Sequence, residues 1–217
     1  MNLKEFLTTV SENPHADIDF IVQKIKNFYR GRPYHNLQHI QECIRTFNLL
    51  DIKTDDRLDP DLVKLALIFH DLIWTPDRTD NEERSAFIAN VWMRDLGLTS
   101  ENEIDIVTVS IEMTKHTKAE HDILLTGRIN TLVYEIASIV CDCDLSILAA
   151  PKERFDEYEN QIRQEYKDVP DLVFFENRSK IMQGFLERSR IYLNDEFYFA
   201  FETKARKNLE KYEMVHS

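Results

Sequence analysis

The stretch "DPDLVKLALIFHDLIW", residues 59–74, predicts the centre of the fold. Pro60 stands where a helix can begin, because its fixed φ angle suits the first helical turn. The residues after it are apolar nearly all round a helix, which is typical of a helix that is covered on every side. The stretch therefore predicts a central, buried helix, and an adjacent pair of ionisable residues, His70 and Asp71, stands near its end.

The sequence on both sides of this stretch predicts further helices. Residues 17–29 and 39–50 each place apolar side chains on one stripe at helical spacing. Asp80 with Glu83 three places later forms a capping-box pattern, and Gly97 stands where that helix would stop. Other helices are expected at about 101–114, 128–149, 152–167, 171–192 and 195–213.

Only four of the 217 residues are glycine, which argues against an all-β fold with many tight turns. No repeat or linker divides the chain. We therefore predict an all-α protein in which residues 1–217 form a single helical bundle domain.

Composition and charge narrow the classes of partner. No apolar run approaches the ~20 residues of a membrane-spanning helix, and the N-terminus resembles no targeting signal, so a cytoplasmic location without membrane contact is expected. The net charge of −12 disfavours a nucleic-acid polymer as partner. It permits a small phosphorylated substrate, because a bound divalent cation reverses the local field. Three cysteines predict core thiols and no disulfide framework, and the oligomeric state is left open.

Ionisable residues lie in several apolar helices. His39 begins one helix, His70 and Asp71 end the next, and "VCDCDLSIL" (140–148) carries Asp142 and Asp144. Their burial is costly unless something compensates. Structural hydrogen bonds would compensate, and so would a metal ion held by imidazole and carboxylate groups. The mixed nitrogen and oxygen set suits a divalent metal, and the spacing alone does not decide between the two late aspartates.

A family resemblance supports the metal interpretation. His39, His70-Asp71 and a late Asp resemble the H…HD…D signature of the HD-domain superfamily of metal-dependent phosphohydrolases. "YHNLQH" (34–39) and "DLS" (144–146) resemble segments of cyclic nucleotide phosphodiesterases. The sequence is most similar to small bacterial predicted HD phosphohydrolases, through "YHNLQHI", "HD", "DNEERSA" and "DCDLSIL", over roughly residues 20–200.

The resemblance implies a metal-dependent hydrolase of a phosphoester or phosphoanhydride in a small molecule such as a nucleotide. It implies that His39, His70, Asp71 and Asp144 bind a divalent metal ion (Mn, Mg, Fe, Co, Ni or Zn) that activates water, and that Asp71 can bridge to a second ion. His35 would be the general acid. After the HD pair the chain reads "LIWTPDRTDNEERSA" and not HD-x-D-H, so cyclic nucleotides are not implied as substrates.

Other residues are weaker candidates. Glu82 would orient the attacking water or hold a second ion, although a helix-capping role explains Glu82 and Glu83 as well. Substrate phosphate would be contacted by Arg32, Lys115, Lys118 or His116, for which surface charge is the alternative. His116 and His121 would otherwise extend the metal site or lie in a solvated loop, "KHTKAEHD" (115–122). Two alternative functions stay open, a di-iron HD-type oxygenase and a non-catalytic module that binds metal or nucleotide.

Overall fold

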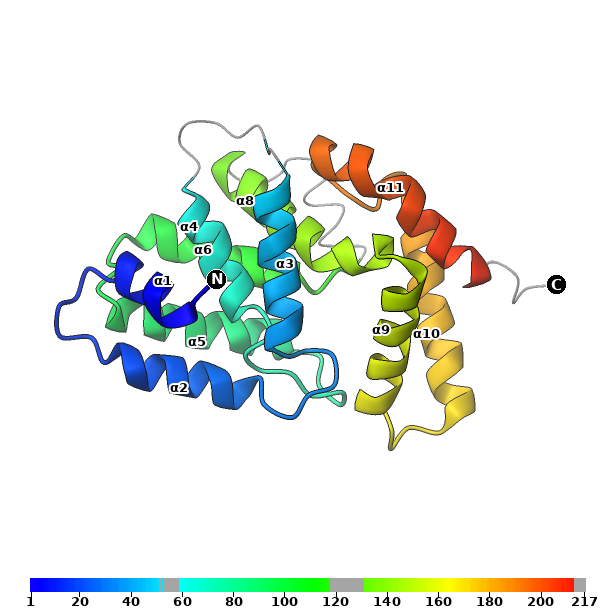
Figure 1. The fold of residues 1–217 in the computed structure, drawn as a ribbon, viewed down its shortest axis with the longest axis horizontal. Coiled ribbons are helices and arrows are strands. Elements are labelled where there is room, and N and C mark those ends of the chain that lie inside the picture. Colours follow the sequence, from blue (N-terminus) through cyan, green and yellow to red (C-terminus); the bar gives the residue numbers. More distant parts are fainter. Residues whose placement is uncertain (51, 53–58, 118–130, 213–217) are drawn as a thin grey trace.

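A computed structural model describes all residues except 51, 53–58, 118–130 and 213–217 (Figure 1). The described part of the chain is helical and contains no strand, which confirms the all-α prediction. The helices are α1 (Leu3–Val10), α2 (Ile18–Phe28), α3 (Leu37–Leu49), α4 (Pro60–Phe69), α5 (Asn81–Asp95), α6 (Glu101–Met113), α8 (Thr131–Leu145), the short 3-10 helix η1 (Ser146–Ala149), α9 (Lys152–Glu165), α10 (Asp171–Leu186) and α11 (Asp195–Leu209).

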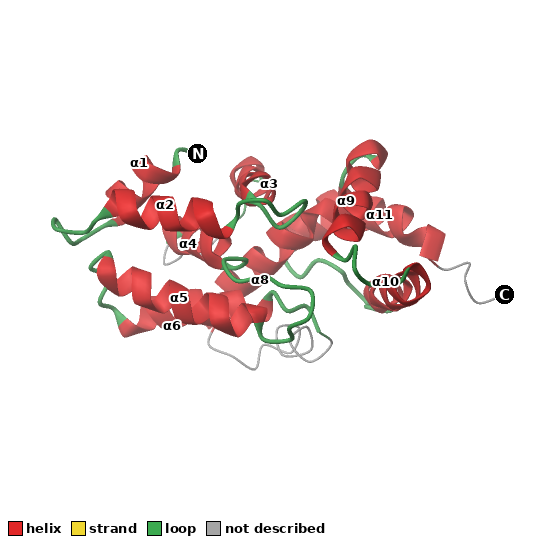
Figure 2. Cartoon of the chain, turned by 90° about the horizontal axis from the view of Figure 1, so that it is seen from below, coloured by secondary structure: helices red, strands yellow, loops and turns green. Residues whose placement is uncertain are grey.

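The helices fall into two groups along the long axis of the molecule. Figure 2 shows α1, α2, α4, α5 and α6 in one half, and α9, α10 and α11 in the other. In Figure 1, α3 stands between the two halves, and α8 passes toward the second half, where η1 leads into α9. No described helix is long and apolar enough to cross a membrane.

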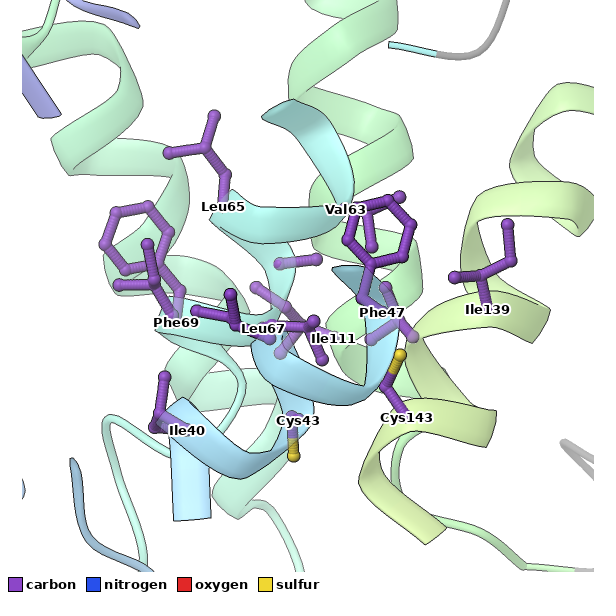
Figure 3. Close-up of a cluster of buried hydrophobic side chains, with 14 of the residues drawn as sticks. Ile40, Cys43, Phe47, Val63, Leu65, Leu67, Phe69, Ile111, Ile139 and Cys143 are labelled. Atoms are coloured by element: carbon purple, nitrogen blue, oxygen red, sulfur yellow. The ribbon is translucent and has the colours of Figure 1, made fainter. Parts of the chain in front are cut away.

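The predicted central helix is α4. Every residue from Leu65 to Phe69 is buried, and α4 packs against α3, α5, α6 and α8. Figure 3 shows its side chains between those of the surrounding helices, with Ile111 and Ile139 among the neighbours. Full burial of one such side chain contributes about 1.5–3 kcal/mol. This packing fixes the end of α4, where His70 and Asp71 lie.

Local caps determine where two important helices begin. The Asn36 side chain accepts hydrogen bonds from the backbone N–H groups of Gln38 and His39, which places His39 in the first turn of α3. Asp59 caps α4 in the same way, and Pro60 occupies its first turn. Both starts follow from residues adjacent in sequence.

The predicted capping box of α5 is not formed, although Asp80 does occupy the position before the helix. The Asp80 carboxylate binds the Arg78 guanidinium at 2.6 Å, and Glu83 pairs with Lys115 at 2.5 Å. Charged partners therefore replace the expected backbone contacts. The predicted stop is correct, because Gly97 has a φ of +87° directly after the helix.

Two other expectations differ from the structure. The N-terminal helix α1 was not predicted, and α10 ends at Leu186 and not near residue 192. The loop after α10 is held by two buried carboxylates: Glu202 accepts the N–H groups of Ile191 and Tyr192, and Asp142 accepts those of residues 193 and 194. The three cysteines are buried and free, as predicted.

Candidate metal centre

The end of α4 is held from outside by side chains of the segment after α2. The Tyr29 hydroxyl donates to the carbonyl of Ile68 at 2.7 Å. The Arg32 guanidinium donates to the carbonyls of Asp71 at 2.5 Å and Leu72 at 2.8 Å. Arg32, predicted to contact substrate phosphate, is thus engaged with the backbone carbonyls of Asp71 and Leu72, and this geometry indicates a positioning role.

Four side chains from three parts of the chain converge beside this point. Nε2 of His39 lies 3.3 Å from Nε2 of His70 and 3.0 Å from Oδ1 of Asp144. Nε2 of His70 lies 3.0 Å from Oδ2 of Asp71 and 3.6 Å from Oδ1 of Asp144. His39 and Asp71 are 3.5 Å apart, Nε2 to Oδ2. The structure thus brings together the four predicted ligands.

The spacing of these atoms fits a shared metal ion. An ion held at about 2.1 Å by each donor separates neighbouring donors by about 3.0 Å at right angles and by about 3.4 Å in a tetrahedron. The observed separations span 3.0–3.6 Å. The group of His39, His70 and Asp71 can therefore hold a metal ion.

The hydrogen bonds around the donor atoms also fit a bound metal ion. Nδ1 of His70 lies 3.0 Å from the carbonyl of Leu67, so in the neutral ring the proton is on Nδ1 and the Nε2 lone pair faces the other donors. Oδ2 of Asp71 is buried and has no hydrogen-bond partner among the described residues. A cation between this lone pair and the orphaned carboxylate oxygen would satisfy both groups.

The charges of the cluster are strongly coupled. Burial alone would lower the pKa of His70, but the charges of Asp71 and Asp144 raise that pKa well above its usual value. Burial alone would raise the pKa of Asp71, yet the charge of His70 outweighs it and brings the pKa below the usual value. Burial is likewise outweighed at Asp144, whose pKa is lowered by hydrogen bonds from three histidines. The centre thus favours ionised carboxylates and a positive charge near them.

The two late aspartates have different surroundings. Asp142 is fully buried and accepts backbone N–H groups from Leu193 at 2.9 Å and Asn194 at 2.7 Å, which is a structural role. Asp144 directs Oδ1 to His39 and Oδ2 to His116. The geometry therefore favours Asp144 over Asp142 as the donor.

His116 belongs to the edge of this centre. Its Nε2 lies 2.7 Å from Oδ2 of Asp144, and its φ of 56° is in the left-handed region. The carbonyl of His116 accepts a hydrogen bond from Arg188. Lys115, the other basic candidate in this segment, forms the ion pair with Glu83. Lys118 and His121 lie outside the described residues.

His35, the predicted general acid, has a partner that the sequence did not reveal. Nδ1 of His35 lies 2.6 Å from Oε2 of Glu165, whose side chain is only 1% exposed. Oε1 of Glu165 accepts the N–H groups of Tyr34 and His35. The His35 ring also stacks on Trp74 at 4.2 Å. Glu165 lies 130 residues from His35 in the sequence, so no local signal pointed to this contact.

Two more residues lie close to the centre. Burial, followed by the charge of Asp71, raises the pKa of Glu82, which lies in the first turn of α5. Sγ of Cys43 lies 3.6 Å from Nδ1 of His39, and Cys43 forms a second possible metal group with His39 and Asp144. The sequence interpretation did not include Cys43, although its spacing of four residues from His39 on a helix was a usable signal.

The "DNEERSA" segment has a structural role that the sequence did not indicate. The Asn81 side chain exchanges hydrogen bonds with the backbone of Thr75, at 3.2 and 3.0 Å. The Ser85 hydroxyl does the same with Ile73, at 3.0 and 3.2 Å. These contacts fix the loop that follows Asp71 and carries Trp74.

Comparison with known proteins finds similarity in three-dimensional structure only. No family model and no curated protein sequence matches the chain. The phosphodiesterase domain of the Salpingoeca rosetta rhodopsin phosphodiesterase is similar with a TM-score of 0.63 and 15% identity, over 99% of this chain and 87% of that one. A structure of the phosphodiesterase domain of the RhoPDE fusion protein from the same choanoflagellate has a TM-score of 0.61 and 15% sequence identity. The match covers 96% of this chain and 82% of that one. At this identity the likeness establishes the fold.

Proposed function

We propose that this chain, which has the fold of a phosphodiesterase-like, HD-type domain, is a metal-dependent phosphohydrolase. Its substrate would be a small phosphorylated molecule such as a nucleotide, cleaved at a phosphoester or phosphoanhydride bond, and residues 1–217 would act as a single domain. The observation that carries the proposal is the convergence of four donor atoms at 3.0–3.6 Å, beside a histidine that is held by a buried glutamate and whose ring lies 6.2 Å from that of His39.

The proposed metal ligands are His39, His70, Asp71 and Asp144. A divalent ion bound there supplies Lewis acidity, which lowers the pKa of water and neutralises phosphoryl oxygens as charge develops on them. The protein contributes the fixed positions of the donors. His70 is oriented by the Leu67 carbonyl, and the backbone at Asp71 is held by Arg32.

His35 is proposed to protonate the leaving oxygen. A proton on Nδ1 is held by the Glu165 carboxylate, so Nε2 is the atom that can transfer a proton. When the phosphorus–oxygen bond breaks, its electron pair stays on the leaving oxygen, which takes the Nε2 proton. Stacking on Trp74 restricts the ring to this orientation. General acid catalysis of this kind accelerates a reaction by about 10²- to 10⁴-fold.

Glu82 and His116 are proposed to assist at the edge of the centre. The pKa of Glu82, raised by burial and then by the charge of Asp71, suits a group that accepts a hydrogen bond from the attacking water and takes its proton. His116 contacts the Asp144 oxygen that faces away from the other donors, so it can orient this carboxylate or contact substrate phosphate.

A panel of nucleotides and phosphoesters, each assayed with Mn²⁺, Mg²⁺, Fe²⁺, Co²⁺, Ni²⁺ and Zn²⁺, tests the proposal. Asp71→Ala should remove both bound metal and turnover. His35→Ala should keep the metal and slow turnover by about 10²-fold or more. His15→Ala, which changes an exposed histidine, is the matched control. Absence of turnover with every metal, or loss of metal from His35→Ala, would contradict the proposal.

The contact of His116 with Asp144 also supports a second candidate, a di-iron oxygenase of the HD type. Such a site needs more imidazole ligands than the four donors provide. Two irons per chain and a visible absorption band in protein purified with iron would favour it. One ion per chain without such a band would exclude it.

A further inference from the structure

A groove of about 370 Å³ opens beside the candidate metal centre. His39 and Asp144 form part of its wall, together with the outward face of α3, the η1 segment and Lys204 of α11. The hydroxyl groups of Thr46 and Ser146, 3.4 Å apart, also line it. A molecule bound at the metal centre can therefore extend into this groove.

A second hollow of about 620 Å³ adjoins the groove, between the start of α9 and the end of α11. The two hollows share four wall residues, Ala149, Ala150, Pro151 and Lys204. The two hollows adjoin at η1, which contacts both α9 and α11 (Figure 1). Each hollow has the size of a small-molecule binding site.

Basic side chains dominate the walls of the two adjoining hollows, which together are called the groove below. Its six cationic residues are Arg45, Lys152, Arg154, Lys204, Lys207 and Lys211. The acidic wall residues apart from the metal donor Asp144 are three, of which Glu42 pairs with Arg154 and Asp156 with Lys152, leaving Glu210. A basic groove is unusual in a chain with a net charge of −12, where the average surface repels anions.

Three of the lysines form a stripe that remains available to a ligand. Lys204 and Lys207 lie on α11 and Lys211 lies just after its end, and all three line the second hollow. Among the residues that the structure describes, none of the three forms an ion pair. Lys211 lies over the ring of Phe155 at 4.8 Å, and Lys204 over that of Phe201 at 5.9 Å. Such contacts favour defined positions for the ammonium groups.

We propose that this groove binds a second phosphate-bearing part of the substrate, remote from the bond that is cleaved. This inference rests on the proposed phosphohydrolase function and narrows its substrate class. The substrate would be a small compound with at least two separated phosphate groups or a short run of phosphates. The metal centre would take the reacting phosphate, and the lysine stripe would take the distant one.

Direct binding tests the groove without any turnover. Inorganic tripolyphosphate is titrated into metal-free protein by calorimetry, at low and at high salt. The double variant Lys207→Glu with Lys211→Glu should weaken binding about tenfold or more, equivalent to about 1.4 kcal/mol, and remove most of its salt dependence. The matched control, Lys24→Glu with Lys26→Glu, makes the same charge change on the exposed face of α2 in the other half of the molecule.

The preference of the enzyme for a substrate with a second phosphate provides a second test of the groove. For each protein, kcat/KM for a phosphoester that carries a remote second phosphate is divided by kcat/KM for p-nitrophenyl phosphate. This ratio should fall about tenfold in the groove variant and stay unchanged in the control. Thermal unfolding verifies that both variants are folded.

The outcomes separate the two proposals. If neither the wild type nor any variant hydrolyses a phosphoester, the proposed function is wrong. The tripolyphosphate titration still tests whether the groove binds phosphate. Equal tripolyphosphate affinity in the wild type and in the groove variant would overturn the groove proposal. Tighter binding of a single-stranded RNA than of tripolyphosphate would overturn it as well, because the groove would then serve a polymer.

Discussion

Replacing Glu165 by glutamine tests the link between the buried glutamate and His35. The substitution keeps the shape of the side chain and an oxygen that can accept the N–H groups of Tyr34 and His35, now 2.8 and 2.9 Å from Oε1. It puts an amide NH₂ group opposite Nδ1 of His35, at the place where Oε2 lies 2.6 Å away. The amide donates a hydrogen bond, so Nδ1 has to accept it and cannot carry its own proton.

The size of the effect follows from this lost contact. A hydrogen bond to a charged group contributes about 1.5–3 kcal/mol, and each 1.36 kcal/mol changes a rate tenfold. We therefore expect Glu165→Gln to lower kcat by roughly 10- to 150-fold for a substrate with an alkoxide leaving group. A p-nitrophenyl leaving group needs little protonation, so its kcat should change only slightly.

Steady-state kinetics with both leaving groups and metal analysis of the purified variant measure these effects. Metal content should equal that of the wild type, because the hydrogen bonds of Glu165 go to residues 34 and 35. Glu153→Gln, an exposed glutamate on the same helix, is the control. Equal losses for the two leaving groups, or loss of metal, would refute the assignment of His35 as general acid and Glu165 as its positioning partner.

Three further predictions concern stability. Asp142→Asn should lower the free energy of unfolding by about 1–3 kcal/mol, because an amide NH₂ would face one of two backbone N–H groups; an unchanged urea midpoint would contradict this. Gly97→Ala should lower the free energy of unfolding by about 2 kcal/mol or more, since φ is +87° and a Cβ would lie 2.6 Å from a backbone nitrogen. Gly184→Ala in α10, with open space around it, should raise the free energy of unfolding by about 0.5–1 kcal/mol. In chelated protein the raised pKa of His70 means that the folded state binds this proton more tightly than the unfolded chain. Its contribution is therefore complete below about pH 6.5 and is lost as the pH rises through the raised value. The Tm of the chelated protein should fall over that range, and added Mn²⁺ should cancel the fall, because metal binding needs the neutral imidazole; a Tm independent of both pH and metal would refute this.

Local sequence was sufficient for most of the fold. The residues around Leu65–Phe69 are apolar all round, and this pattern correctly predicted the central helix. Asn36 and Pro60 are adjacent to the helix starts that they determine. The loop after α10 was not predicted, because the carboxylate of Asp142 that holds part of it lies 51 residues away in sequence.

The candidate site was predictable only in part. His39, His70, Asp71 and Asp144 were selected through a family resemblance and do converge in space, while their role as ligands stays a prediction. Hydrophobic spacing alone could not distinguish Asp144 from Asp142. The distinction depends on which oxygen atoms face backbone amides, and this is decided by packing between helices.

The contact between His35 and Glu165 has a consequence for how activity and folding are related. It closes a loop of 130 residues and joins the segment before α3 to the far end of α9. The contact that fixes Nδ1 of the imidazole therefore exists only while α9 is docked on the first half of the molecule, whereas the stacking on Trp74 does not involve α9. Under the proposed roles, a substitution that weakens the packing of α9, even one distant from every donor atom, should slow proton transfer from His35 before it lowers the affinity for metal.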